Sequence, residues 1–226
     1  MKQYRFPQSL VNAPSPPHGN APVRPDEEWA NALTHGVAAL SALLLGGWLV
    51  LDALPDNPGL AFACGAYIAS VFATFSFSAL SHTILKQPLL DTLRAWDQAM
   101  IYAMISGTYT PIIYRHAPDA VRVPLLTAIW VAAFAGIAGK LLLRHRVNNV
   151  ATVSYLLLGW LPAIPLYGNV PSGLGWGMLL GGVLYTLGVI VLLNDSKLKY
   201  LHVVWHLFVI SAALCHFMAI WWYVVA

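Results

Sequence analysis

Three histidines are the residues of this sequence whose type and spacing point to chemistry. His82 lies at the end of one apolar run, and His202 and His206 open another. Residues four apart on a helix share a face, so His202 and His206 can bind one metal ion, as in zinc motifs with His at i and i+4. A third imidazole would leave the fourth position of Zn²⁺ open to water, which is the catalytic pattern. The alternative is a group of hydrogen-bonded histidines without a metal.

Two further polar residues accompany these histidines. Ser78 lies one helical turn before His82 and could hydrogen-bond a metal-bound water, or could bond back to a carbonyl of its own helix. Asp97 could accept a proton from that water or orient a histidine. It could also cap the start of a helix, a position that suits Asp. The sequence leaves both pairs of alternatives open.

The composition places the chain in a membrane. Only 9% of its 226 residues are charged and 58% are hydrophobic, whereas soluble domains carry about 25% charged residues. Cys64 and Cys215 both lie in apolar runs, which excludes a disulfide scaffold. The basic residues form no stripe, so no nucleic-acid partner is predicted.

The pattern of apolar runs predicts an all-α membrane protein, a bundle of seven transmembrane helices. A spanning helix needs about 20 mostly apolar residues. Residues 1–25 are rich in proline and are predicted to be a disordered cytoplasmic tail, followed by a membrane domain over residues 26–226. The seven predicted spans are Leu33–Leu54, Leu60–Leu85, Ala95–Tyr114, Val123–Leu143, Val150–Leu166, Leu174–Leu193 and Leu201–Val225.

The distribution of Lys and Arg predicts a cytoplasmic N-terminus and an outside C-terminus. With this orientation ten of the 12 basic residues lie on the cytoplasmic side, and only Arg115 and Arg122 lie outside. The same orientation brings the candidate site residues to one depth, at the cytoplasmic ends of their spans. These residues are His82, Asp97, His202 and His206, together with Glu28, Asn31 and His35 of the first span.

Four other features bear on the architecture. Lys140 lies one turn from the cytoplasmic end of the fourth span and is expected to snorkel toward the interface. His216 follows His206 by three turns, about 15 Å along the axis, and is too deep to bind the same ion. It is expected to be a buried hydrogen-bonded histidine, with an inner proton or substrate role as the alternative. His35 is expected beside the ligands. A glycine stripe predicts close helix packing and comprises Gly173, Gly177 and Gly181.

Several motifs resemble the bacterial haemolysin III family, a branch of the progestin and adipoQ receptor group. The resemblance covers nearly all of the chain from Glu28 onward. The motifs are Glu28-Trp-Ala-Asn31-Ala-Leu-Thr34-His35-Gly36, Ser78-x3-His82, Asp97, Gly107-Thr108-Tyr109-Thr110-Pro111, Gly159-Trp160 and His202-x3-His206-x9-His216. The chain departs from the family pattern at Ser81, where Tyr is frequent, and at Gln98, where His is frequent.

The resemblance implies a zinc ion near the cytoplasmic face of a seven-helix bundle in the bacterial inner (plasma) membrane. It implies His82, His202 and His206 as ligands, with Ser78 and Asp97 beside a bound water. It also implies kinship with membrane hydrolases of ceramide-like lipid amides. Membrane lipids are the expected partners.

Four hypotheses about function follow. The first is a zinc-dependent hydrolase of lipid amide or ester bonds, with Asp97 taking the proton of the water and Ser78 positioning it. The second is a non-catalytic zinc protein that senses lipids or regulates membrane energetics. The third is cytolysis, for which bilayer perturbation on overexpression is a simpler cause than a secreted pore. A transporter is the fourth, and the lack of paired carboxylates deep in the spans disfavours it. The oligomeric state is not predicted.

Overall fold

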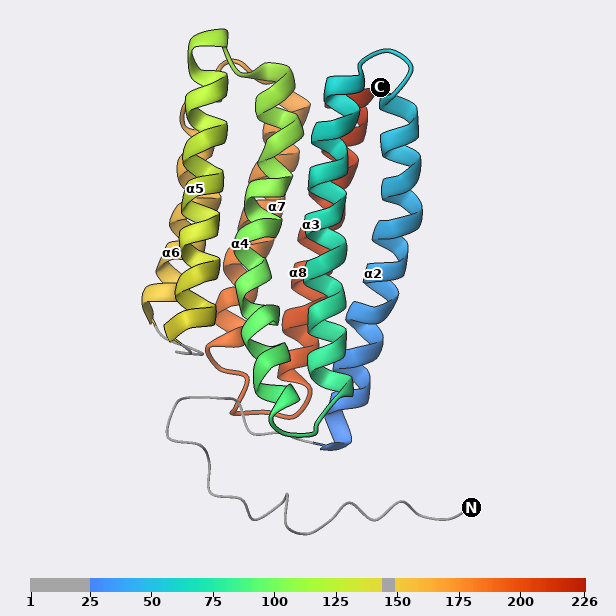
Figure 1. Cartoon of the computed structure of the whole chain (residues 1–226), viewed down its shortest axis with the longest axis vertical. Helices are drawn as coiled ribbons and strands as arrows, with labels where there is room; N and C mark the ends of the chain where they lie inside the picture. The colour runs from blue at the N-terminus through green and yellow to red at the C-terminus, as the bar shows by residue number, and fades with distance from the viewer. Residues whose placement is uncertain (1–24, 144–148) are drawn as a thin grey trace.

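The described part of the chain is helical throughout. The computed structural model describes residues 25–143 and 149–226, and within them it has seven α-helices and no strand. The predicted tail lies outside the described residues apart from its last position. The helices run side by side along the long axis (Figure 1). They are α2 (Pro25–Ala53), α3 (Pro58–Thr83), α4 (Leu89–His116), α5 (Asp119–Leu143), α6 (Asn149–Trp160), α7 (Ser172–Leu192) and α8 (Leu201–Ile220), with a 3₁₀ turn at Leu161–Ala163 and a π-turn at Trp221–Val225.

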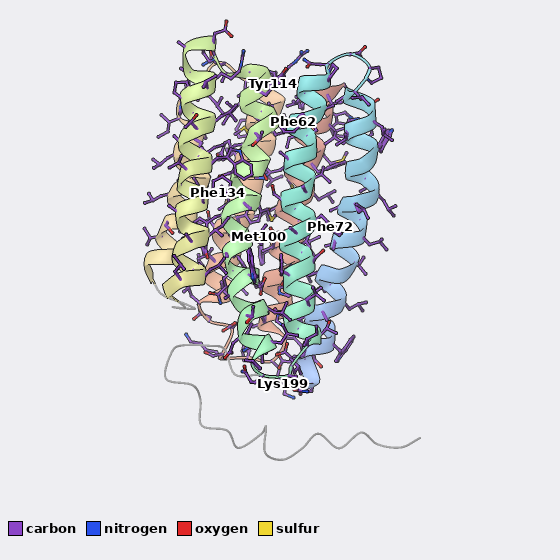
Figure 2. All side chains as sticks on the ribbon, viewed as in Figure 1. Phe62, Phe72, Met100, Tyr114, Phe134 and Lys199 are labelled. Carbon is purple, nitrogen blue, oxygen red and sulfur yellow. The ribbon has the colours of Figure 1, made fainter. Side chains whose placement is uncertain are left out.

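Five of the helices are long and apolar enough to cross a membrane, namely α2, α3, α5, α7 and α8 with its π-turn. Their outward faces carry large apolar side chains: Phe62 is 81% exposed, Leu142 79% and Phe134 62% (Figure 2). Water penalises such a surface at about 25 cal/mol per Å² of apolar area, whereas lipid does not. The chain is therefore a multi-pass helical membrane protein.

Two helices differ from the prediction of seven comparable spans. α4 has 28 residues and starts at Leu89, six residues before the predicted Ala95, but it carries more polar side chains than the five apolar helices. α6 has only 12 residues and continues into the short 3₁₀ turn that contains Pro162. Both helices lie in the same bundle as the other five (Figure 1).

One end of the bundle gathers the candidate site residues. The start of α2, the α3–α4 connection and the α7–α8 connection lie together there, and the C-terminus lies at the opposite end (Figure 1). We call this the histidine end, because it holds His82 in the last turn of α3 and His202 at the start of α8. The fold therefore brings together residues that are far apart in the sequence.

The predicted glycine stripe packs α7 against α8. A Cβ added at Gly177 would lie 2.5 Å from the Cβ of Ala219, and one added at Gly181 would lie 2.3 Å from Nε2 of His216. Real Cβ atoms do not approach neighbours this closely. Close approach of the two helices therefore requires glycine at these positions, as the sequence predicted.

Candidate metal centre

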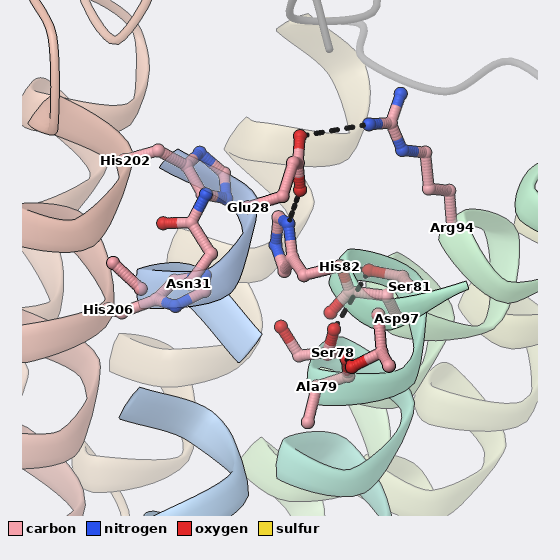
Figure 3. Close-up of polar contacts among 12 residues, drawn as sticks. Glu28, Asn31, Ser78, Ala79, Ser81, His82, Arg94, Asp97, His202 and His206 are labelled. Carbon is pink, nitrogen blue, oxygen red and sulfur yellow. Dashed lines mark hydrogen bonds and ion pairs between the residues drawn. The ribbon is translucent and has the colours of Figure 1, made fainter. Parts of the chain in front are cut away.

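The three predicted ligands meet at the histidine end (Figure 3). One nitrogen from each of His82, His202 and His206 lies within 4.8 Å of the other two. The ring centroid of His82 is 5.1 Å from the ring centroids of both His202 and His206. The centroids of His202 and His206 are 4.8 Å apart. His206 is 1% exposed and His82 8% exposed, so the cluster is largely shielded. Three histidines from two helices therefore form a site that could hold a metal ion.

Each imidazole is held through its Nδ1 atom. Nδ1 of His82 lies 2.5 Å from Oε2 of Glu28, and Nδ1 of His202 lies 3.0 Å from Oδ2 of Asp195. An ionised carboxylate can only accept a hydrogen bond, so Nδ1–H donates to it, and the free lone pair of the neutral ring lies on Nε2. Nε2 of His82 is buried and has no hydrogen-bond partner among the described residues. Metal-ligating histidines show this arrangement, with one nitrogen oriented by a carboxylate and the other directed at the metal.

Thr34 performs the same task for His206. Its hydroxyl lies 3.1 Å from Nδ1 of His206 and within 3.0 Å of the carbonyl oxygens of Ala30 and Asn31. The hydroxyl has one proton, and a carbonyl can only accept it. When that proton goes to a carbonyl, the hydroxyl accepts from Nδ1–H of His206. All three rings are then left with Nε2 as the nitrogen available for coordination.

The donor set fits zinc. A catalytic zinc site has three protein ligands, such as three imidazoles, and a fourth coordination position open to water. At tetrahedral angles, Zn–N bonds of about 2.0–2.1 Å place ligand nitrogens about 3.3–3.4 Å apart. The three nitrogens lie within 4.8 Å of one another, so they would move closer together on binding.

Asp97 lies beside the cluster and does not cap its helix. It sits two turns into α4, which begins at Leu89, so the N-cap alternative is wrong. Ser81 Oγ lies 3.2 Å from Oδ2 of Asp97, and the side chain of Ser78 also interacts with this carboxylate. Ser78 is buried and lines the same cavity as Asp97 and the histidines. Both predicted catalytic residues are thus brought to the histidine cluster, from α4 and α3.

Sequence reasoning missed some of the supporting residues. Asp195 was not singled out, although it precedes His202 by seven residues in the α7–α8 connection. Arg94 was also missed; it pairs with Glu28 at 3.7 Å and so anchors the carboxylate that holds His82 (Figure 3). The available signal for Asp195 was its place as an acidic residue only seven positions before a candidate ligand. No local pattern linked Glu28 to His82, because 54 residues separate them.

Two further histidines are not members of the three-histidine cluster. His35 stacks on His206 with ring centroids 3.6 Å apart and packs against Phe75. It therefore packs against the face of the His206 ring. His216 lies deeper in α8, where its Nε2 is 3.3 Å from the carbonyl oxygen of Met178. Its hydrogen bond to α7 agrees with the expected hydrogen-bonded histidine, but the side chain is half-buried and lines the cavity.

A cavity of about 790 Å³ extends from the cluster into the bundle. Its polar end contains the three histidines, Ser78 and Asp97. On α4 the lining runs from Arg94 to Ile112, which is about 27 Å of helix at about 1.5 Å per residue. Beyond the first turns the lining is mostly apolar and includes Met104, Ile105, Leu156, Leu179 and Val209. The cavity therefore has the shape and polarity to hold an amphipathic molecule.

Lys140 also lines this cavity, contrary to the expectation that it would snorkel. It is buried, and its Nζ donates to Oε1 of Gln98 at 3.0 Å. The lysine therefore turns into the bundle although its helix ends three residues later, at Leu143. The hydrogen bond to Gln98 of α4 holds the Lys140 side chain inside the bundle, and no feature of the sequence indicated this contact.

The contact between the Asp195 carboxylate and His202 leads to a testable expectation. Replacing Asp195 with Asn removes the charge that fixes the Nδ1 proton of His202, and loss of such a partner weakens metal binding by about 10–100-fold. We expect this loss in a competition titration of zinc against a fluorescent chelator. Asp26→Asn is the matched control, because Asp26 pairs with Lys199 at the same end of the bundle. Equal zinc affinity in Asp195→Asn and the wild type would show that His202 does not depend on this carboxylate.

Comparison with known proteins agrees with this architecture. The haemolysin-III related family matches residues 23–217. Hemolysin-3 of Bacillus cereus is 35% identical over 205 residues, covering 88% of this chain and 92% of that protein. Hemolysin-3 homolog of Bacillus subtilis (strain 168) is 33% identical over 206 residues, covering 88% and 95%. The human monocyte to macrophage differentiation factor is 28% identical over 222 residues, covering 96% and 92%. With a family match over most of its length, the chain belongs to the haemolysin-III related family.

Proposed function

We propose that this protein is a zinc-dependent hydrolase of lipid amide or ester bonds in the bacterial plasma membrane. In this proposal residues 26–226 form seven spans, with the histidine end at the cytoplasm. Two findings support the orientation: the excess of Lys and Arg in segments assigned to that side, and the position of the α2 start and the C-terminus at opposite ends of the bundle. The reaction would then take place near the cytoplasmic surface of the membrane.

One observation carries the catalytic part of the proposal. Three imidazoles with oriented Nδ1 atoms stand at the polar end of an apolar cavity large enough for a lipid chain. A zinc ion at such a site supplies water with a pKa of about 7 and polarises a carbonyl. A purely structural histidine cluster requires no adjoining cavity, so the combination favours chemistry on a lipid.

The residues of the chain divide the remaining tasks. Asp97 accepts the proton of the attacking water on its carboxylate and returns it to the leaving amine or alcohol. Ser81, with Oγ 3.2 Å from Oδ2, orients that carboxylate. The hydroxyl of Ser78 positions the water or the carbonyl oxygen. The apolar wall holds the acyl chain and excludes bulk water from the reacting carbonyl.

A second function is favoured by the way the cluster joins the helices. His82 comes from α3, His202 and His206 come from α8, and their partners come from α2 and the α7–α8 connection. A zinc ion bound there would tie these segments together and could make their packing respond to zinc or to a lipid in the cavity. This is the non-catalytic sensor or regulator of membrane energetics, and lysis on overexpression would follow from bilayer perturbation.

Release of fatty acid distinguishes the two functions. The purified zinc-loaded protein in lipid nanodiscs is offered N-acyl amides and acyl esters, and the products are measured by mass spectrometry. We expect fatty acid release that His82→Ala abolishes and that His116→Ala retains, because His116 lies at the other end of the bundle against the carbonyl of Tyr223. Stoichiometric zinc without release from any of these lipids would exclude the hydrolase and favour the sensor.

A further inference from the structure

Lys140 buries its charged ammonium in the bundle although a lysine at this position could place it in the interface. A charge within a membrane protein is expensive and usually functional, and a lysine near a helix end can ordinarily place its ammonium in the interface. Lys140 has only three residues of α5 after it, yet it is 7% exposed and faces the cavity. Its position therefore points to a ligand group that the ammonium would meet inside.

Neighbouring groups fix the ammonium in the cavity wall. Nζ donates to Oε1 of Gln98 and lies 6.0 Å from the ring centre of Tyr155. The hydroxyl of Tyr155 donates to the backbone carbonyl of Gln98 at 2.9 Å, which joins α6 to α4 at this level. We call Gln98, Lys140 and Tyr155 the lysine wall. All three residues line the cavity.

The lysine wall adjoins the reaction site. Gln98 follows Asp97 directly on α4, and Arg94 lies one turn before Gln98, and all three line the cavity. Apart from Asp97, the acidic residues that line the cavity are engaged on the side of α8: Glu28 with His82, Asp195 with His202, and Glu27 with the backbone N–H of Tyr200. Negative charge is therefore concentrated on the histidine side of Asp97, and the ammonium of Lys140 stands on the side of α5 and α6.

We infer that Lys140 and Gln98 bind an anionic group of the lipid in the cavity, and that the substrate class is an acidic amphiphile such as an N-acyl amino acid. In such a molecule the carboxylate lies next to the amide, and Asp97 and Gln98 both line the cavity at the same level of α4. The ammonium and the amide NH₂ of Gln98 donate to the carboxylate, while the acyl chain extends along the apolar part of the cavity. A neutral ceramide-like lipid has no anionic group to pair with this ammonium. The term substrate rests on the proposed hydrolase, whereas the binding of the anion does not.

A pair of ligands that differ by one charge tests this inference. Binding of N-dodecanoylglycine and of uncharged N-dodecanoylglycinamide to the zinc-loaded protein is measured by isothermal titration calorimetry in an uncharged detergent. We expect the wild type to bind the acid about tenfold more tightly, the value of one charge-assisted hydrogen bond. Lys140→Gln should lose this preference. Lys197→Gln, an exposed lysine of the α7–α8 connection, should keep it.

The outcomes separate this inference from the proposed function. Equal binding of acid and amide by the wild type overturns the inference, whether or not Lys140→Gln folds. A preference that survives in Lys140→Gln also overturns it and assigns the carboxylate to the histidine cluster. N-acetylglycine should not compete at the same concentration; if it does, the site binds small carboxylates and not a lipid. A Lys140-dependent preference without any hydrolysis would refute the hydrolase and leave the anion site standing.

Discussion

Asp97→Asn is expected to lower the rate of lipid hydrolysis by about 10²–10⁴-fold without changing the zinc content. Asparagine has the same shape but cannot accept the proton of the attacking water, and this range is typical for loss of a general base. The three nitrogens that approach one another come from histidines alone, so zinc should remain bound. The rate is measured by single-turnover fatty acid release, and zinc by mass spectrometry on the same sample.

The control for Asp97→Asn is Asp119→Asn. Asp119→Asn removes the same negative charge from α5. Its side chain is 92% exposed and pairs with Arg122 at the other end of the bundle. It should hydrolyse lipids at the wild-type rate. Loss of zinc from Asp97→Asn would make Asp97 a ligand, and an undiminished rate would remove it from the mechanism.

His206→Ala is expected to abolish the stabilisation of the fold by zinc. A ligand that binds only the folded state contributes about 2.7 kcal/mol to the free energy of unfolding at 100 times its Kd, and about 4.1 kcal/mol at 1,000 times. His206 is one of the three clustered histidines that could hold the ion, and it is the most deeply buried of them. Chelation with EDTA should therefore lower the Tm of the wild type and leave the already lower Tm of His206→Ala unchanged.

His116→Ala again provides the matched variant for this measurement. It removes an imidazole from the opposite end of the bundle, where the ring contacts the carbonyl of Tyr223. Its Tm should still fall on chelation, by as much as that of the wild type. A chelation-dependent Tm in His206→Ala, equal to that of the wild type, would contradict its assignment as a ligand.

The clustering of the three histidines was predictable because it depends on short-range spacing and on the ends of apolar runs. The i and i+4 pair His202 and His206 shares a face in any helix, and the end of the second run placed His82 at the matching depth. The glycine stripe was predictable for the same reason. The haemolysin III resemblance, carried by the same motifs, is confirmed by the family match over residues 23–217 and extends through the human relative to the progestin and adipoQ receptor group.

Contacts between distant segments were not predictable. The pairing of Glu28 with His82 depends on how α2 packs against α3, and the inward turn of Lys140 depends on Gln98 of α4. The start of α4 was placed too late because its first turns, up to Asp97, are too polar to register as an apolar run. That error kept the N-cap alternative for Asp97 open until the helix boundary was known.

The most direct test of the metal site is the zinc content of the detergent-purified protein, measured by mass spectrometry beside that of His82→Ala. His82 supplies one of the three clustered nitrogens, and its Nε2 has no other partner among the described residues. The account predicts about one zinc per chain in the wild type and almost none in His82→Ala. A well-folded wild type that holds no zinc after zinc has been offered, or a His82→Ala variant that retains it, would contradict the account.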